Sequence, residues 1–310
     1  MASSSSANWE LVTIGRGSFA SVHVLTGRPV AFKAVLDSSR TNELHREFAM
    51  LCELYQARDR DSIFSFTCPI AYHDSESPDG FTDSGGAQRF SVSIDDLQLL
   101  NFPTAVFAMD HVIPLPPSTA KSIRQFYPAG SDSAPDPSLC RLYFGKEIQV
   151  TGQSGRPHTF FNSSNFPLDS NRYRHITIPK DCYVTPEKIA FGMGQTISRI
   201  HWHMGYDARD IEFVLGGRGF SDVGLYVIDF NQMRHWSKDK ADVPALVNAH
   251  YANDPYYPCA RNTDTLYTQF KAGYMSACPE TAYDAATAFL EAIETEQHKR
   301  DVKIKSIGVS

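Results

Sequence analysis

The sequence predicts an α+β protein with two lobes, a small β-rich N-terminal lobe and a larger, mainly helical C-terminal lobe. Three observations support this class: β-branched alternating runs fill the first hundred residues, helical periodicity dominates from about residue 185, and the proline-rich "IPLPP" (113–117) interrupts the chain. A length of 310 residues fits one large or two small domains. We expect a disordered tail at 1–8, the N-lobe at 9–111 and the C-lobe at 112–310.

The N-lobe is expected to hold several strands and one helix. The segment 39–57 has helical spacing, which places Leu44, Phe48, Leu51 and Leu54 on one face. The polar, glycine-bearing segment 74–89 is expected to form a loop. Strands are expected at "WELVTIGRGSFASVHVL" (9–25), "PVAFKAVL" (29–36), "FSVSI" (90–94) and "TAVFAMDHV" (104–112).

The C-lobe is expected to become helical after two loops at 128–138 and 151–158. The segment 185–205 begins with Thr185 as an N-cap and Pro186 in the first turn, which is typical of a helix start. Two further helices are expected at 264–277 and 281–300.

Composition limits the classes of partner. The net charge is −6 and no long basic run exists, which argues against a nucleic-acid-binding protein. The sequence contains no run of about 18 apolar residues, so no membrane span is expected. The N-terminus lacks an apolar core of the kind found in signal peptides, so a cytoplasmic location is expected. Six cysteines show no C-x-x-C pair, which favours reduced structural thiols.

Two glycines stand between apolar strand-like segments in "IGRGSFASVHV" (14–24). A β-turn-β loop with Gly15 and Gly17 lets backbone amides approach phosphates closely, because glycine lacks a Cβ atom. Val22 follows on the returning strand. A plain hairpin turn fits the same pattern.

Lys33 lies inside the apolar run "VAFKAV", where burial of an ammonium group is unfavourable unless it is paired. Glu47, on the following helix, is the expected partner, and such a pair would fix the ammonium against a polyphosphate. A lysine on a solvent-facing strand edge is the alternative. Further along, Met109 and Asp110 end an apolar strand whose backbone is suited to bind a purine edge, although an ordinary core strand explains the same residues.

Acidic residues gather in "GYDARDIEFVLGG" (205–217), and Asp229 follows the apolar run in "LYVIDFNQ" (225–232). The spacing between Asp207 and Asp229 allows two short strands and a turn. Carboxylates suit Mg²⁺, and one aspartate can accept a proton from an attacking hydroxyl. Helix capping and surface charge are the alternative roles. His201 and His203 invite a zinc interpretation, but helix positions i and i+2 point apart, so packing roles are favoured.

The order of these segments resembles that of protein kinases, which implies a two-lobed protein-kinase-like fold that binds ATP and Mg²⁺. The glycine loop is similar to G-x-G-x-x-G-x-V, with Ala20 replacing the third glycine. The resemblance implies phosphate contacts from Lys33, paired with Glu47. It further implies catalytic roles for Asp207 and Arg209, and metal binding by Glu212 and Asp229.

Several positions depart from the protein-kinase pattern and favour a narrower group. Gly205 and Tyr206 stand in place of His-Arg, Glu212 in place of an asparagine, and Asn231 in place of a glycine. These features resemble aminoglycoside- and choline-type phosphotransferases. The phrases "RLYFGKE", "FFNSSNFPL", "IHWHMGYDARDIEFVLGG" and "NDPYYP" resemble a fungal kinase-like family of unknown function, in which D-x-x-D-I-E-F-V-L-G is a hallmark; this implies a place near secondary metabolism.

The resulting expectation is an ATP- and Mg²⁺-dependent phosphotransferase acting on a hydroxyl group of a small molecule. Two alternatives stay open. The first is a module that binds a nucleotide or a partner without turnover, favoured by the missing His-Arg pair and by Glu212. The second is a scaffold reused for an ATP-independent cyclisation or isomerisation of a natural product.

Overall fold

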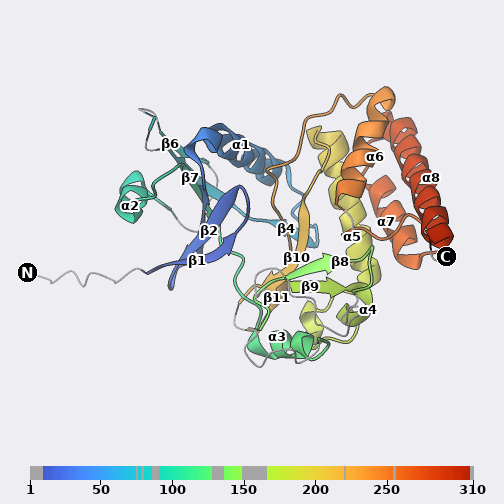
Figure 1. Ribbon diagram of the computed structural model, residues 1–310, viewed down its shortest axis with the longest axis horizontal. Coiled ribbons are helices and arrows are strands. Elements are labelled where there is room, and N and C mark those ends of the chain that lie inside the picture. Colours follow the sequence, from blue (N-terminus) through green and yellow to red (C-terminus); the bar gives the residue numbers. More distant parts are fainter. Residues whose placement is uncertain are drawn as a thin grey trace, which may run out of the picture. The chain divides into compact units, whose positions relative to one another are not determined.

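The computed structural model describes residues 10–74, 76–77, 80–85, 91–127, 136–148, 166–219, 221–253 and 256–307. The chain forms two compact units (Figure 1). The first comprises Met1–Gln56 with Thr67–Val112, and the second comprises Ala57–Phe66 with Ile113–Ser310. The expected tail at 1–8 and loop at 151–158, and most of the loop at 128–138, lie outside the described residues.

A six-stranded antiparallel sheet organises the first unit, in the order β1-β2-β3-β7-β5-β6. The hairpin around the two glycines and the following strand form as expected, because alternating apolar residues place one set of side chains on each face. The strands are β1 (Leu11–Arg16), β2 (Ala20–Leu25), β3 (Val30–Val35), β5 (Pro69–His73), β6 (Phe81–Asp83) and β7 (Val106–Asp110).

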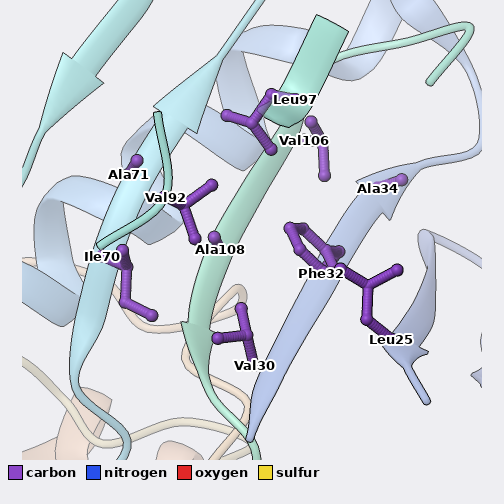
Figure 2. Close-up of a cluster of buried hydrophobic side chains, with 10 residues drawn as sticks. All are labelled: Leu25, Val30, Phe32, Ala34, Ile70, Ala71, Val92, Leu97, Val106 and Ala108. Carbon is purple, nitrogen blue, oxygen red and sulfur yellow. The ribbon is translucent and has the colours of Figure 1, made fainter. Parts of the chain in front are cut away.

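One face of this sheet carries an apolar cluster that the short helix α2 (Ile94–Leu100) covers (Figure 2). Phe32 from β3 and Val106 from β7 meet Val92 and Leu97 from the α2 segment. All of these side chains are buried, so the cluster forms one half of the core of the first unit.

Helix α1 (Thr41–Ala57) supplies the other half. Its apolar stripe Leu44, Phe48, Leu51 and Leu54 is buried as the helical spacing predicts. The Phe48 ring lies 5.7 Å from the ring of Phe107 on β7. Because both faces of the sheet are covered, every residue of β3 is buried.

Two local predictions for the first unit are wrong. The strand expected at 90–94 is absent from its described part: residues 91–93 have no regular structure and α2 begins at Ile94. A capping box explains this helix start, because the Ser93 side chain accepts from the Asp96 amide while the Asp96 side chain accepts from the Ser93 amide. The polar segment 74–89 is also not wholly a loop, since it contains β6.

The second unit contains a five-stranded mixed sheet in the order β4-β11-β10-β8-β9. Its centre is the antiparallel hairpin of β10 and β11, which the sequence predicts between Asp207 and Asp229. The flanking strands pair in parallel, β4 with β11 and β8 with β9. The strands are β4 (Phe64–Phe66), β8 (Cys140–Tyr143), β9 (Phe166–Asp169), β10 (Glu212–Gly217) and β11 (Val223–Ile228).

Helices make up most of the rest of the second unit. The Thr185 hydroxyl accepts from the Lys188 amide at 3.4 Å, so the predicted N-cap begins α5. A π-helical turn, Arg199–Met204, continues α5 and ends at Gly205, whose φ of 78° lies in the left-handed region. The helices are α3 (Pro117–Arg124), α4 (Ser170–Tyr173), α5 (Pro186–Ser198), α6 (Val243–Ala252), α7 (Thr265–Ser276) and α8 (Tyr283–Ile307).

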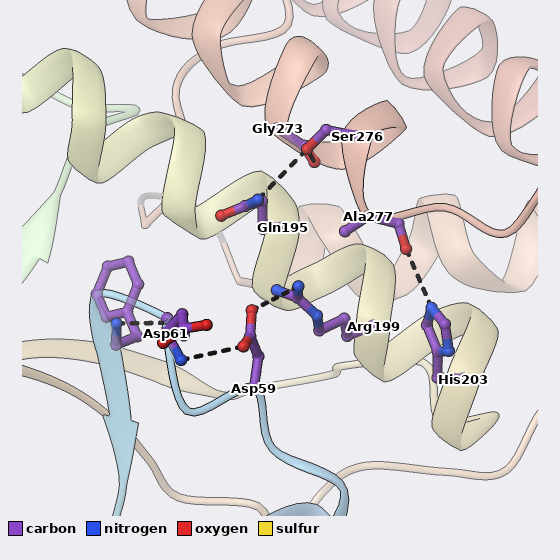
Figure 3. Close-up of polar contacts among 10 residues, drawn as sticks. Asp59, Asp61, Gln195, Arg199, His203, Gly273, Ser276 and Ala277 are labelled. Carbon is purple, nitrogen blue, oxygen red and sulfur yellow. Dashed lines mark hydrogen bonds and ion pairs between the residues drawn. The ribbon is translucent and has the colours of Figure 1, made fainter.

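Helices α5 and α7 approach each other closely because glycines face the contact. A Cβ atom on Gly194 would lie 2.0 Å from the Phe270 carbonyl oxygen, and one on Gly273 would lie 2.0 Å from the Phe191 carbonyl oxygen. Polar contacts fix the same region: Gln195 contacts Ser276, and Arg199 forms an ion pair with Asp59 at 2.6 Å (Figure 3).

The predicted α+β class is confirmed by an antiparallel N-terminal sheet followed by helices and a second sheet. Among the described helices, none combines the length and apolar character needed to cross a membrane.

Candidate functional site

The hairpin of β10 and β11 brings two predicted site residues together at one end of the second sheet. Glu212 begins β10 and is paired with Ile228, the last residue of β11, so Asp229 follows directly beside it. The loop 207–211 leads into the same end of β10. The hairpin thus brings the end of the acidic stretch next to Asp229 within the second unit.

Asp207 is held by backbone amides. Its Oδ1 atom accepts from the Arg209 amide at 3.1 Å and from the Arg234 amide at 2.9 Å. Its own amide donates to the Arg234 carbonyl at 2.9 Å. No donor within the described part of the chain reaches Oδ2. Burial raises the pKa of Asp207 above its usual range, while the two amide hydrogen bonds act in the opposite direction. Such a carboxylate is fixed in orientation and is a stronger base than an exposed aspartate.

Three non-glycine residues around this site have left-handed backbone conformations. The φ angles are 52° at Ala208, 61° at Asp210 and 64° at Asp229. Each such conformation costs about 1–3 kcal/mol and persists only where the surroundings enforce it. Strain of this kind concentrates at functional sites.

The side chain of Asn253 enforces the conformation of the loop 207–211. Its Oδ1 atom accepts from the Asp210 amide, and its Nδ2 atom donates to the carbonyls of Ala208 at 3.1 Å and Ile211 at 3.2 Å. Nδ2 also lies 2.9 Å from the Tyr257 hydroxyl. Asn253 is only 2% exposed, so it acts as a buried clamp on the loop.

Replacing Asn253 by alanine is expected to lower the free energy of unfolding by about 1–3 kcal/mol, because buried amide and carbonyl groups of the loop lose their partner. Urea denaturation measures this change. Asn262→Ala is the matched control, since Asn262 is exposed, and it should shift stability by no more than about 0.5 kcal/mol. Equal effects of the two substitutions would contradict the clamp.

Asp210 was not among the predicted site residues, yet it belongs to the same group of charges. Burial raises its pKa, and the nearby Asp229 carboxylate adds to that rise. The Gln232 amide donates to Asp210 Oδ2. Its place in the acidic stretch was the signal that could have identified it.

Glu212 forms an ion pair with Arg141 of β8, with 2.7 Å between Oε1 and Nη2. Arg141 was also not predicted as a site residue, because no motif or spacing in the sequence relates it to Glu212. The oxygen donors of Glu212 and Asp229 suit Mg²⁺, which commonly takes one or two carboxylates and completes its shell with water or phosphate oxygens. In the described residues no group of three or more His, Cys, Asp and Glu side chains could hold a metal. Mg²⁺ bound by Glu212 and Asp229 would therefore need further oxygen ligands from water or phosphate.

Several buried polar atoms near these carboxylates lack a hydrogen-bond partner within the described structure. They are Arg209 Nε, Asn231 Oδ1 and the Tyr256 hydroxyl oxygen. Arg209 lies close enough for its charge to lower the pKa of both Asp207 and Asp210. Buried polar groups in folded proteins are nearly always hydrogen-bonded, so these atoms can bind a water molecule or a polar ligand.

The two histidines considered for zinc make other contacts. His201 Nδ1 lies 2.8 Å from the Tyr274 hydroxyl, which also accepts from Trp202 Nε1 at 2.9 Å. His203 Nε2 lies 3.1 Å from the Ala277 carbonyl (Figure 3). The Tyr206 amide donates to the Ile200 carbonyl at 3.0 Å, so the π-helical turn supports the chain that leads into the loop 207–211.

In the first unit, Lys33 and Glu47 form a buried ion pair. The distance from Lys33 Nζ to Glu47 Oε1 is 2.6 Å, and the residues are 9% and 2% exposed. This is the pairing that the sequence suggested, rather than a lysine on a solvent-facing edge. The Lys33 ammonium also lies 5.7 Å from the ring centre of Phe19.

The glycine hairpin of the first unit turns at residues 17–19. Gly15 sits at a register shift in β1 and is paired with Val22, and the Gly17 amide donates to the Ala20 carbonyl at 2.9 Å. Further along the sheet, the Asp110 amide donates to Cys68, and Met109 is paired with Ala31 of β3. The Asp110 amide would have to leave the Cys68 carbonyl to bind a purine edge.

Residues 225–285 match the model of the family DUF3669, which is described as a zinc finger protein. No model of a kinase-like family matches, so the resemblance to a protein-kinase-like family inferred from the motifs is wrong. No curated protein matches the chain.

The residues within the matched segment do not fit a zinc ion. Cys259 Sγ lies 3.0 Å from the Gly145 carbonyl oxygen, and Cys278 Sγ lies 3.4 Å from that of Pro279. His235 stacks on Tyr206, and His250 stacks on Tyr257. These four side chains thus face different surroundings, and the described residues contain no cluster of metal-ligating groups.

Proposed function

We propose that the protein is an ATP- and Mg²⁺-dependent phosphotransferase that acts on a hydroxyl group of a small molecule, in the cytoplasm. The observation that carries this proposal is the site of the second unit. Asp207 is held by backbone amides in the same region as Arg209, Glu212 and Asp229, and Arg209 Nε and Asn231 Oδ1 lack partners among the described residues. A phosphate-bearing ligand with a divalent cation offers both acceptors for the guanidinium group and positive charge for the carboxylates.

Asp207 has the properties of a general base. Its Oδ2 atom has no donor in the described structure, and burial raises the pKa of the carboxyl, so it is suited to take the proton of an acceptor hydroxyl. Arg209 would neutralise phosphate charge. Bound Mg²⁺·ATP would supply the phosphoryl group, which passes to the hydroxyl oxygen as ADP leaves.

The first unit, considered by itself, supports the same chemistry. The buried ammonium of Lys33 is oriented by Glu47 at 2.6 Å, and a glycine-bearing hairpin lies on neighbouring strands of the same sheet. Paired lysines and flexible glycine loops are both suited to polyphosphate binding.

The test combines thermal-shift measurements with Mg²⁺·ATP and an assay of ADP release. Asp207→Asn is expected to keep the Mg²⁺·ATP-induced rise in Tm but to lower ADP release at least about 100-fold, because the base is lost. Asp229→Asn is expected to lose the Mg²⁺-dependent part of the shift. Asp284→Asn, at an exposed helical position, is the control and should behave as the wild type.

A second candidate is a module that binds nucleotide without turnover. The ion pair between Glu212 and Arg141 favours it, because Arg141 competes with a cation for that carboxylate. A thermal shift without ADP release would support the binding module over the phosphotransferase. The absence of both signals would overturn both functions.

A further inference from the structure

The hydroxyl of Tyr256 is buried and has no hydrogen-bond partner among the described residues, although the rest of the residue is held firmly. Tyr256 is 7% exposed, and its hydroxyl oxygen is unsatisfied among the described residues. Its carbonyl accepts from the Phe144 amide at 3.1 Å, and its ring packs edge-on against Tyr143 with centroids 5.1 Å apart. The ring is therefore fixed, so the unpartnered hydroxyl is not explained by a freely turning side chain.

Neighbouring residues identify the surroundings of this hydroxyl. The ring of Tyr256 packs against that of Tyr143, which ends β8. In the same strand Arg141 is paired with Val214 of β10 and forms the 2.7 Å ion pair with Glu212, so Tyr256 lies at the end of the sheet that carries the proposed metal-binding carboxylates. A buried neutral hydroxyl without a partner is unfavourable, and a bound ligand would remove that cost.

We propose that the Tyr256 hydroxyl binds an oxygen atom held by the divalent cation at Glu212 and Asp229. The oxygen belongs to a coordinated water or to a nucleotide phosphate, since Mg²⁺ keeps several waters and is commonly bound together with phosphates. A phenol can donate to a phosphate oxygen and can accept from a coordinated water. This role rests on the proposed function and assigns to it a contact residue that the sequence did not suggest.

The test uses Tyr256→Phe in the full chain. In the ligand-free protein this substitution removes only an unpartnered polar atom, so Tm is expected to stay constant or to rise. Binding of Mn²⁺, measured by electron paramagnetic resonance as a substitute for Mg²⁺, is expected to weaken about 3–10-fold because one hydrogen bond to the bound oxygen is lost. Tyr251→Phe is the matched control.

The control residue has a partnered hydroxyl, which donates to the Ile293 carbonyl at 2.6 Å. Tyr251→Phe should therefore lower Tm and leave Mn²⁺ binding unchanged. The titrations are run with Mn²⁺ alone and with Mn²⁺ and ATP. Weaker binding by Tyr256→Phe in both titrations identifies a coordinated water, and weaker binding only with ATP identifies a phosphate oxygen.

Two results would overturn the role of Tyr256. One is wild-type affinity of Tyr256→Phe in both titrations, and the other is a loss of Tm as large as that of Tyr251→Phe, which would reveal a partner for the hydroxyl. If the wild-type protein binds no Mn²⁺ in either titration, the proposed metal site fails and the role of Tyr256 fails with it. Failure of Tyr256 alone leaves wild-type Mn²⁺ binding intact, so the two cases are distinguishable.

Discussion

Replacing Lys33 by methionine is expected to lower the free energy of unfolding by about 3–5 kcal/mol, because removal of one partner leaves the other charge of a buried pair uncompensated. Glu47 is 2% exposed and loses an ammonium group 2.6 Å from Oε1. Methionine is similar in length to the aliphatic part of lysine, so the change in packing is small. Urea denaturation followed by circular dichroism measures the loss.

The double variant Lys33→Met/Glu47→Leu separates the charge effect from packing. It removes both charges, so it is expected to recover most of the lost stability. Arg40→Met serves as a surface control, since the Arg40–Glu43 pair is exposed, and exposed pairs contribute about 0–1 kcal/mol. A double variant as unstable as Lys33→Met would show that the pair does not determine the effect.

Acidification is the second large effect that we expect. Burial lowers the pKa of both His201 and His250 to about 3, whereas an unfolded histidine titrates near 6.5. Between these values the unfolded chain binds protons that the folded chain does not, so stability falls as pH falls. Each histidine should remove about 2.3 kcal/mol between pH 6.5 and pH 4.5, and neither should affect stability above pH 7.

The variant His250→Phe isolates this contribution. It keeps the aromatic stacking on Tyr257 and removes the titrating group, so the slope of stability against pH below pH 6.5 should decrease by about 1.4 kcal/mol per pH unit. The raised pKa values of Asp207 and Asp210 act in the opposite sense, because the folded state takes up their protons first. His298→Gln, at an exposed position, should leave the slope unchanged; an equal change in slope would refute the assignment.

Regular elements with a long apolar pattern could be predicted from the sequence. The hairpin, the strand bearing Lys33, and helices α1 and α5 each show a period of about two or 3.6 residues. The four-residue strands β8 and β9 are too short to show a period, and they pair in parallel rather than through a hairpin. At residues 90–94 the alternating pattern predicted a strand that does not form. The Ser93 and Asp96 capping box, which begins α2, could already be recognised in the sequence.

The residues of the candidate site also divide into those that the sequence could predict and those that it could not. Glu212 begins one strand of a hairpin and Asp229 directly follows the other, and the spacing between Asp207 and Asp229 had predicted room for two short strands and a turn. Arg141, Asn253 and Tyr256 reach that end of the sheet from other parts of the chain, with no spacing relation to reveal them. A side chain whose role is to hydrogen-bond a distant loop shows no periodic pattern in the sequence. Its role can be recognised only from the three-dimensional structure.

The strand β4 has a consequence for biosynthesis. Phe64 pairs with Leu225 on β11, so β4 leaves the ribosome long before its partner exists. In the meantime residues 67–112 can complete the six-stranded sheet, while β4 presents an open edge that favours aggregation. A recombinant fragment that starts at residue 113 would lack this strand altogether, so joining residues 57–66 to it through a short linker should improve its yield of folded protein.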